Sequence, residues 1–308
     1  MQWDAGHLKA LPDTPQTHPL SPPPQNCVQL NRELLLHLLA LLADKIEHSK
    51  WFALPVCLAV HGGAQIVLSE AMQHLPGARR TTRDVDYFDY TFSRLAVRAG
   101  HSDASACLKR CIKLTASAAG VPQLGEDWMN CAPDVALLHM REYVPLAASV
   151  SRLPQRLTGD RRHSAVHGKC TLDQIWEETM APANRRVGTL FRSRALVIVA
   201  VPWHWTVALK FARFRKHDPA DIVAVLRLVE PPFKLGASTV QWTAERLEAW
   251  LRYACPGMQY DRYLPGSLHL WREHMRRAVL PVEEARKTSE HSQPQPLPCW
   301  RCGATPHP

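Results

Sequence analysis

The sequence predicts an α+β protein with a mixed β-sheet, flanking helices and a helical C-terminal part. Two short apolar runs, residues 56–60 and 195–201, stand between proline, glycine or arginine residues, as buried strands often do. Elsewhere apolar residues recur every three or four positions, which is the spacing of a helix. The clearest helical stretches are residues 104–119, 203–230 and 239–254.

The composition indicates a globular protein with an anionic partner. Of the 308 residues, 46% are hydrophobic and 21% are charged, and the formal net charge is +9. This excess of positive charge favours association with a nucleotide or a nucleic acid. No run reaches the roughly 20 apolar residues of a membrane span, and the N-terminus lacks an apolar leader. We therefore expect no membrane partner. The nine scattered cysteines indicate reduced thiols and an intracellular location, cytoplasmic or nuclear.

Proline content and the loss of apolar periodicity divide the chain into four parts. Residues 1–28 form a proline-rich tail that we expect to be disordered. Residues 29–230 form the main domain, and residues 231–280 form a helical C-terminal extension. Residues 281–308 are polar and rich in proline, so we expect a second disordered tail.

Two polar segments outside the main pattern are ambiguous. Cys299 and Cys302 form a Cys-x-x-Cys pair, which supplies half of a tetrahedral zinc site, but no second pair lies nearby. Residues 145–170 are rich in arginine and have no periodicity, which is typical of a long loop. The charge of this loop suits a nucleic-acid backbone, although a solvated loop explains it equally well.

A leucine-rich helix opens the main domain. Asn31 is a favourable N-cap, and Glu33 lies in the first turn, where the helix dipole favours an acid. Over residues 31–43 leucines surround the helix on nearly all sides. We therefore expect the helix either to be buried against the sheet or to bind a partner.

A glycine turn follows the first predicted strand. Gly62 and Gly63 allow a sharp bend and a close approach of the backbone to a ligand. The helix predicted over residues 64–74 would then begin with free backbone N–H groups and the positive end of its dipole. Such a helix N-terminus suits a phosphate group.

Two carboxylates follow on the next β-prone run, residues 84–88. Asp84 and Asp86 are two positions apart, so their side chains share one face of a strand. Neighbouring carboxylates repel each other unless a cation lies between them. Together with the glycine turn, this pair predicts a site for a nucleoside triphosphate bound to Mg²⁺ or Mn²⁺.

The predicted helix over residues 203–230 carries a second polar group. One of its faces carries, at steps of three or four, Lys210, then Arg213 or Phe214, then His217 and Asp221. Lys210 is suited to neutralise triphosphate oxygens as a point charge. Alternatively, the acids form a salt-bridged set that holds the helix on the sheet. That set would consist of Asp218, Asp221, Lys210, Arg213 and Lys216.

Short motifs in these stretches resemble a known signature: an apolar strand ending in Gly-Gly, a helix, and then Arg-x-Thr-x-Asp-x-Asp. Here the signature reads His61-Gly62-Gly63 and, at residues 80–86, RTTRDVD. Residues 207–222, VALKFARFRKHDPADI, are similar to the helix that follows the last core strand in the same proteins. The resemblance is to the nucleotidyltransferase superfamily of the DNA polymerase β type, most closely to its minimal, abortive-infection-toxin-like branch.

The resemblance implies a nucleotidyltransferase-like fold and the transfer of a nucleoside monophosphate from a triphosphate onto RNA, a protein or a small molecule. Asp84 and Asp86 would hold Mg²⁺ or Mn²⁺ for catalysis, and Lys210 would balance the triphosphate charge. The nucleotide-binding residues would be Gly62, Gly63, Arg80, Thr81 and Arg83.

One part of the family pattern lacks an evident counterpart. Active members usually add a third carboxylate from a later strand, and the candidates here are Asp134 and Asp89. The strand at residues 195–201 has no acid. An alternative function is therefore a nucleotide- or RNA-binding module of the same fold without catalysis. A third hypothesis is an interaction protein that recruits a partner through its leucine-rich helix.

Overall fold

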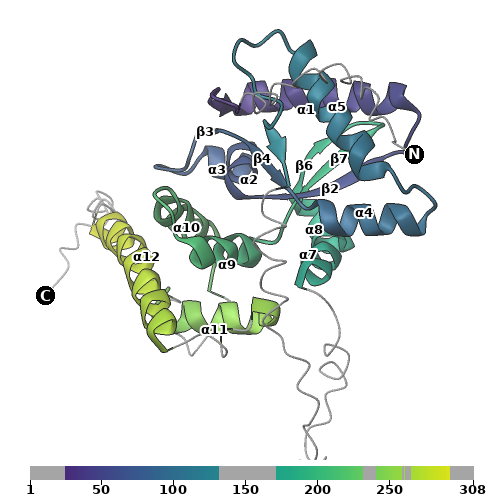
Figure 1. The fold of residues 1–308 in the computed structure, drawn as a ribbon. Coiled ribbons are helices and arrows are strands. Elements are labelled where there is room, and N and C mark those ends of the chain that lie inside the picture. The colour runs from purple at the N-terminus through teal and green to yellow at the C-terminus, as the bar shows by residue number, and fades with distance from the viewer. Residues whose placement is uncertain (1–24, 132–170, 232–240, 259, 261–264, 292–308) are drawn as a thin grey trace, which may run out of the picture.

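The computed structural model describes residues 25–131, 171–231, 241–258, 260 and 265–291 (Figure 1). A five-stranded mixed sheet lies between layers of helices, which confirms the predicted α+β class and the mixed sheet. A second, two-stranded sheet joins β1, Leu30–Asn31, to β3, Thr81–Thr82. No helix in the described ranges is long and apolar enough to cross a membrane.

The strand order of the main sheet is β5-β4-β2-β7-β6. β2, Val56–His61, and β7, Leu196–Ala200, are parallel neighbours and correspond to the two predicted apolar runs. Each has a strand on both sides, which explains why both are almost entirely apolar. β4 runs antiparallel to β2. The remaining strands are β4, Val85–Tyr87, β5, Met129–Asn130, and the edge strand β6, Thr189–Arg192, which the sequence analysis misses.

Helices cover both faces of the main sheet (Figure 1). Alternate side chains of β2 enter different apolar clusters, Leu58 and Val60 on the side of α1 and α5, and Ala59 on the side of α7 and α9. The helices on the first side are α1, Arg32–Ser49, α4, Asp89–Arg98, and α5, Ala104–Ala118. Those on the second side are α7, Thr171–Met180, α9, Trp203–Arg213, and α10, Asp218–Leu228.

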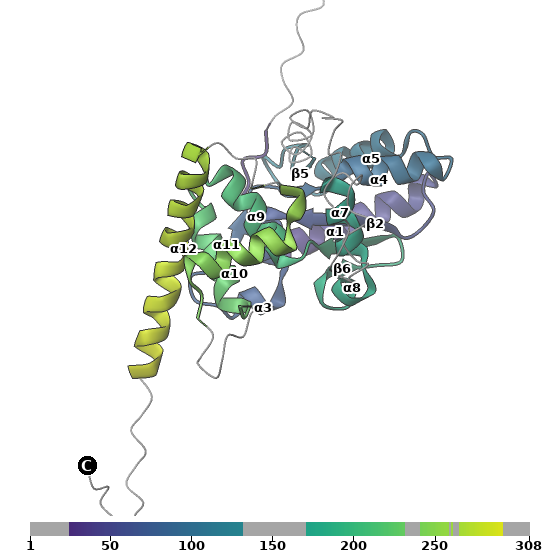
Figure 2. The same cartoon turned by 90° about the horizontal axis from the view of Figure 1, so that it is seen from below.

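The C-terminal helices extend this second layer. α11, Ala244–Ala254, and α12, Pro265–His291, share the apolar cluster of α9 and α10. The view from below shows α12 along the outer side of α10 and α11 (Figure 2). Short helical segments complete the described chain. They are α2, Gly62–Leu68, α3, Glu70–Gln73, α8, Pro182–Gly188, and the 3₁₀ turn Pro256–Met258.

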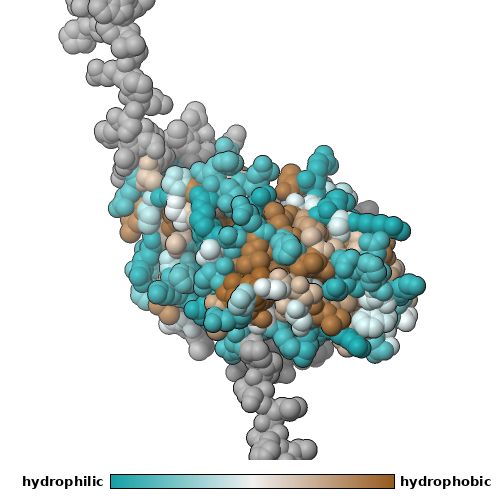
Figure 3. Space-filling view, turned by 90° about the horizontal axis from the view of Figure 1, so that it is seen from above, coloured by the Kyte–Doolittle hydropathy of each residue, from teal (hydrophilic) through white to brown (hydrophobic). Residues whose placement is uncertain are grey.

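The leucine-rich helix is buried against the sheet, which was one of the two predicted alternatives, the other being a partner-binding helix. The Asn31 side chain accepts a hydrogen bond from Leu34 N at 2.9 Å, which confirms the N-cap. Leucines 35, 38, 39 and 42 are fully buried on the sheet side. Seen from above, the face of α1 and α5 still shows an apolar area framed by hydrophilic residues (Figure 3), and Leu114 of α5 is half-exposed.

The prediction of one continuous helix over residues 203–230 is wrong, because this stretch forms two helices, α9 and α10. Phe214 ends α9 in the left-handed conformation with φ of 38°. Pro219 opens α10, where its missing N–H group costs nothing. The Asp218 carboxylate accepts the Arg215 N–H at 2.7 Å and so fixes the bend. The polar residues of this stretch therefore meet across a helix–helix corner instead of along one helical face.

Three predicted boundaries also shift. The helix after the glycine turn is interrupted at Ser69, between α2 and α3. Asn26, placed in the N-terminal tail, is buried and bonded to Asp127 at 2.6 Å, so the fold begins before residue 29. At the other end α12 continues through Pro281 to His291, although the sequence predicts a tail from residue 281. α12 packs on α10 and α11 on both sides of Pro281, with Val279 and Val282 in or against their apolar cluster.

Candidate functional site

The glycine turn lies directly against the second acid. His61, the last residue of β2, pairs with Asp86 of β4, and Gly62 follows with φ of 77°, in the left-handed region. A Cβ atom on Gly62 would lie 2.8 Å from Asp86 Oδ2. Only glycine satisfies both the backbone conformation and this close approach. The close neighbour of Gly62 is therefore a carboxylate of the protein itself, and the predicted approach of this turn to a ligand stays a prediction.

This geometry gives a prediction for the Gly62→Ala variant. We expect its free energy of unfolding to fall by about 2–3 kcal/mol, because the left-handed backbone and the overlap with Asp86 both act against a side chain. Gly77→Ala is the matched control: Gly77 has a φ of 75°, but a Cβ atom added there would meet no other atom within 4 Å. It should lose only about 1–2 kcal/mol. Equal losses in urea unfolding would show that the carboxylate contact has no energetic weight.

The two predicted acids lie together. Asp84 immediately precedes β4, and Asp86 within the strand has only 8% of its surface exposed. Burial and the neighbouring charge of Asp84 raise the pKa of Asp86 to about 7, while Arg213, Lys210 and Arg215 act in the opposite direction. An acid pair whose repulsion and burial are not fully compensated fits a divalent cation as its missing counter-charge.

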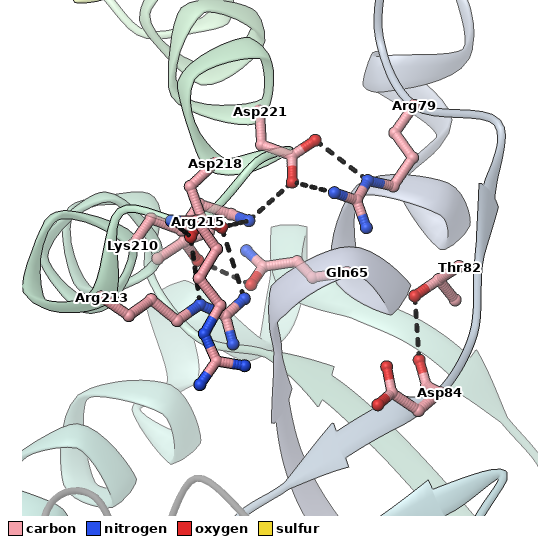
Figure 4. Close-up of polar contacts among 10 residues, drawn as sticks. Gln65, Arg79, Thr82, Asp84, Lys210, Arg213, Arg215, Asp218 and Asp221 are labelled. Carbon is pink, nitrogen blue, oxygen red and sulfur yellow. Dashed lines mark hydrogen bonds and ion pairs between the residues drawn. The ribbon is translucent and has the colours of Figure 1, made fainter. Parts of the chain in front are cut away.

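A cleft of about 600 Å³ opens beside Asp84. Five of its lining residues are cationic and two are aspartates. The cations come from two sides: the segment before β4 supplies Arg79 and Arg83, and the corner between α9 and α10 supplies the other three. Those three are Arg213, Arg215 and Lys216. Figure 4 shows Arg79 on the first side and Arg213 and Arg215 on the second. The cleft is therefore a concave, positively charged site with a carboxylate at its edge, which suits an anionic ligand bound together with a metal ion.

Lys210 is the centre of a buried ion-pair cluster. Its side chain is 2% exposed, and Nζ donates to Asp218 Oδ1 at 3.0 Å and to Asp221 Oδ2 at 2.6 Å. Burial raises the pKa of Asp218, but the charges around it, chiefly that of Lys210, outweigh burial and lower the pKa below its usual value. The salt-bridged alternative for this helix is thus confirmed for Lys210, Arg213 and both acids. Lys210 does not line the cleft, so its expected action on the triphosphate stays a prediction.

The three polar residues of the predicted nucleotide-binding set, Arg80, Thr81 and Arg83, have different surroundings. Arg83 and Thr81 line the cleft, and the Thr81 hydroxyl donates to Gln29 at 3.1 Å. Arg80 points elsewhere: its guanidinium donates to the carbonyl oxygens of Met72 and Leu75, each at 3.3 Å, around the end of α3. Its placement in the nucleotide-binding set is therefore not supported by position, because it does not line the cleft.

Two residues at the turn escaped the sequence analysis. Arg79 and Thr82 are the side chains that a Cβ atom on Gly63 would meet. Thr82 also donates from Oγ1 to the Asp84 carbonyl oxygen at 3.1 Å. The Arg-x-Thr-x-Asp-x-Asp spacing itself marks Thr82, since it stands two positions before Asp84. No comparable local pattern marks Arg79.

His61 is a further residue that the sequence analysis left without a role. It is buried and stacks on Phe88 with ring centroids 5.0 Å apart. Burial, followed by the charges of Arg213 and Lys210, lowers its pKa to about 3, so the ring is neutral at physiological pH. Within the described residues its Nε2 atom has no hydrogen-bond partner.

Of the two candidates for a third carboxylate, only Asp89 lies in the described part of the chain. Asp134 lies outside the described residues and stays a prediction. Asp89 is in the first turn of α4, where it accepts from Ser105 Oγ at 2.6 Å and pairs with Lys109 at 3.3 Å, so it links α4 to α5. The described ranges contain no group of three acidic, histidine or cysteine side chains that could hold one metal ion.

The strand beside β4 places an amide next to the two acids. Asn130 of β5 pairs in register with Asp86, and its Nδ2 lies 3.5 Å from Asp84 Oδ2. The basic segment 145–170 and the cysteines at 299 and 302 lie outside the described residues.

Comparison with known proteins yields no match to this chain among family models, curated proteins or solved structures. The resemblance to polymerase-β-type nucleotidyltransferases therefore rests on the motifs alone.

Proposed function

We propose that this protein is a metal-dependent nucleotidyltransferase that transfers a nucleoside monophosphate from a nucleoside triphosphate to an acceptor hydroxyl. One observation carries the proposal: Asp84 lines a strongly cationic cleft, and its charge acts on the buried Asp86, which lies against Gly62. A ligand that combines a divalent cation with several phosphate groups complements both features.

In this proposal Asp84 and Asp86 hold Mg²⁺ or Mn²⁺, and the cationic residues of the cleft bind the phosphates. A metal ion bound there would stabilise the charge of the leaving pyrophosphate. The acceptor oxygen forms the new bond to the α-phosphorus while the bond to the bridging oxygen breaks. The hydroxyl proton leaves to solvent, and pyrophosphate departs with the bonding electrons. The acceptor is RNA, a protein or a small molecule.

The first test is metal-dependent nucleotide binding. Isothermal titration with ATP, CTP, GTP and UTP should show binding that requires Mg²⁺ or Mn²⁺, weakened at least about tenfold in Asp84→Ala and in Asp86→Ala. Asp44→Ala is the matched control, because Asp44 is an exposed acid on α1 that does not line the cleft. Binding that is unchanged in both site variants, or that needs no metal, would contradict the metal site.

The second test is transfer itself. Incubation with α-labelled triphosphates and either total RNA or a protein extract should leave label on one acceptor class. The label should be absent with Asp86→Ala. This experiment also identifies the acceptor.

A binding module without catalysis is the second candidate function. The amide of Asn130 beside Asp86, in place of a third carboxylate, favours it. This candidate predicts metal-dependent triphosphate binding with no transfer of label to RNA or protein. The two tests together therefore separate the candidates.

A further inference from the structure

Arg79 is held in a fixed orientation by a buried acid. Its Nε lies 3.1 Å from Asp221 Oδ1 and its Nη2 lies 2.8 Å from Asp221 Oδ2, a two-bond fork (Figure 4). The Asp221 side chain is 2% exposed and also accepts from Lys210. A guanidinium bound through two of its nitrogens to an anchored carboxylate has little freedom to rotate.

The third nitrogen of Arg79 is left for another partner. Nη1 makes no hydrogen bond or ion pair within the described residues, and it lies 2.8 Å from the point where a Gly63 Cβ atom would be. In Figure 4 it points away from Asp221, on the side where Thr82 and Asp84 lie. The Arg79 side chain is 22% exposed and lines the cleft. A donor is thus presented at the glycine turn, beside the acid pair.

The charge of the surrounding cluster favours an anion at this nitrogen. Arg79, Lys210 and Arg213 share two carboxylates, Asp218 and Asp221, which leaves one positive charge in excess. Arg83, on the same segment, is a further cation of the cleft with no ion pair in the described part of the chain. A guanidinium whose own counter-ion is shared in this way remains a good donor to phosphate oxygens.

We propose that Arg79 is a phosphate-binding residue, which donates from Nη1 to a non-bridging oxygen of a triphosphate in the cleft. This inference rests on the proposed function and adds a residue to it that the motifs do not contain. The competing interpretation is purely structural: the fork only fastens α10 to the segment before β3. A structural role changes the free energy of unfolding, whereas a binding role changes affinity in a folded variant.

An ion-paired arginine elsewhere provides the control for the experiment. Arg79→Ala and Arg79→Lys are compared with Arg94→Ala, which removes a guanidinium that pairs with Asp173 and does not line the cleft. Each protein is titrated with inorganic tripolyphosphate without metal and with ATP plus Mg²⁺, and its thermal unfolding is recorded. Arg79→Lys keeps the charge and one bond to Asp221, so it provides a folded variant if Arg79→Ala is unstable.

We expect both Arg79 variants to bind tripolyphosphate and ATP about tenfold or more weakly, since a charge-assisted hydrogen bond is lost. Arg94→Ala should stay within about twofold of the wild type. Arg79 variants that unfold more easily but bind both ligands normally would overturn the inference and leave the proposed function intact. Tripolyphosphate binding that depends on Arg79, without metal-dependent ATP binding, would preserve the anion site and reject the proposed function. If the wild type binds neither ligand, both are rejected.

Discussion

Replacing Lys210 by methionine is expected to lower the free energy of unfolding by about 3–5 kcal/mol. Lys210 neutralises Asp218 and Asp221 in a cluster where all three side chains are almost fully buried. Methionine fills a similar volume but leaves both carboxylates short of a counter-charge in a region of low polarity. The cost of a buried, uncompensated charge then exceeds that of lost packing. Such a loss is a large fraction of the total stability of a domain of this size.

Lys216→Met is the control for this prediction. Lys216 is an exposed cation three residues beyond Arg213, and it lines the cleft without an ion pair in the described residues. Its replacement should change the free energy of unfolding by less than about 0.5 kcal/mol. Both variants are compared by urea denaturation at pH 7.5. A Lys210→Met protein as stable as the control would mean that Lys210 does not compensate the two acids.

Replacing Asp86 by asparagine should stabilise the protein in the absence of metal. The pKa of Asp86 is raised to about 7 in the folded protein, from an ordinary value of 3.8. The folded state therefore binds this proton more tightly than the unfolded chain does. The contribution of Asp86 to stability is complete below about pH 3.8 and is lost as the pH rises to about 7. Asparagine cannot ionise and so escapes this loss.

The difference between Asp86→Asn and the wild type should be close to zero at pH 4 and grow to an upper limit of about 4 kcal/mol at pH 8. Denaturation midpoints across this range measure it, and titrating groups common to both proteins cancel in the difference. Under the proposed function, Mg²⁺ with ATP should stabilise the wild type at pH 8 and leave the variant unchanged. A difference that is flat with pH would contradict the raised pKa of Asp86.

The opposite effects of this substitution have one physical cause. Asp86 is buried beside Asp84, against the backbone of Gly62, so its ionised form is unfavourable without a cation. A buried charge that only a bound ligand neutralises lowers the stability of the unbound protein. Increased stability together with lost nucleotide binding would thus support a functional role for the acid pair.

Local patterns were sufficient to predict part of the fold and of the site. The apolar runs that became β2 and β7 needed no knowledge of their neighbours, because a strand buried on both faces is apolar throughout. Gly62 and the pair Asp84 and Asp86 were also found locally, since a turn and a two-residue spacing are properties of a few adjacent positions. The end of α9 at Phe214 was missed, because apolar periodicity continued across the break.

The sequence by itself determined the mixed sheet, the glycine turn and the presence of two neighbouring acids at β4. Only the tertiary structure decided which cations surround those acids. Arg79 and Asp221 are 142 positions apart in the chain, and Lys210 meets Asp221 only because α9 and α10 fold back at a corner. An ion pair between distant segments leaves no periodic signal in the sequence. Arg79 and Asp221 pair because α10 packs against the segment before β3, which brings the two charged groups within bonding distance.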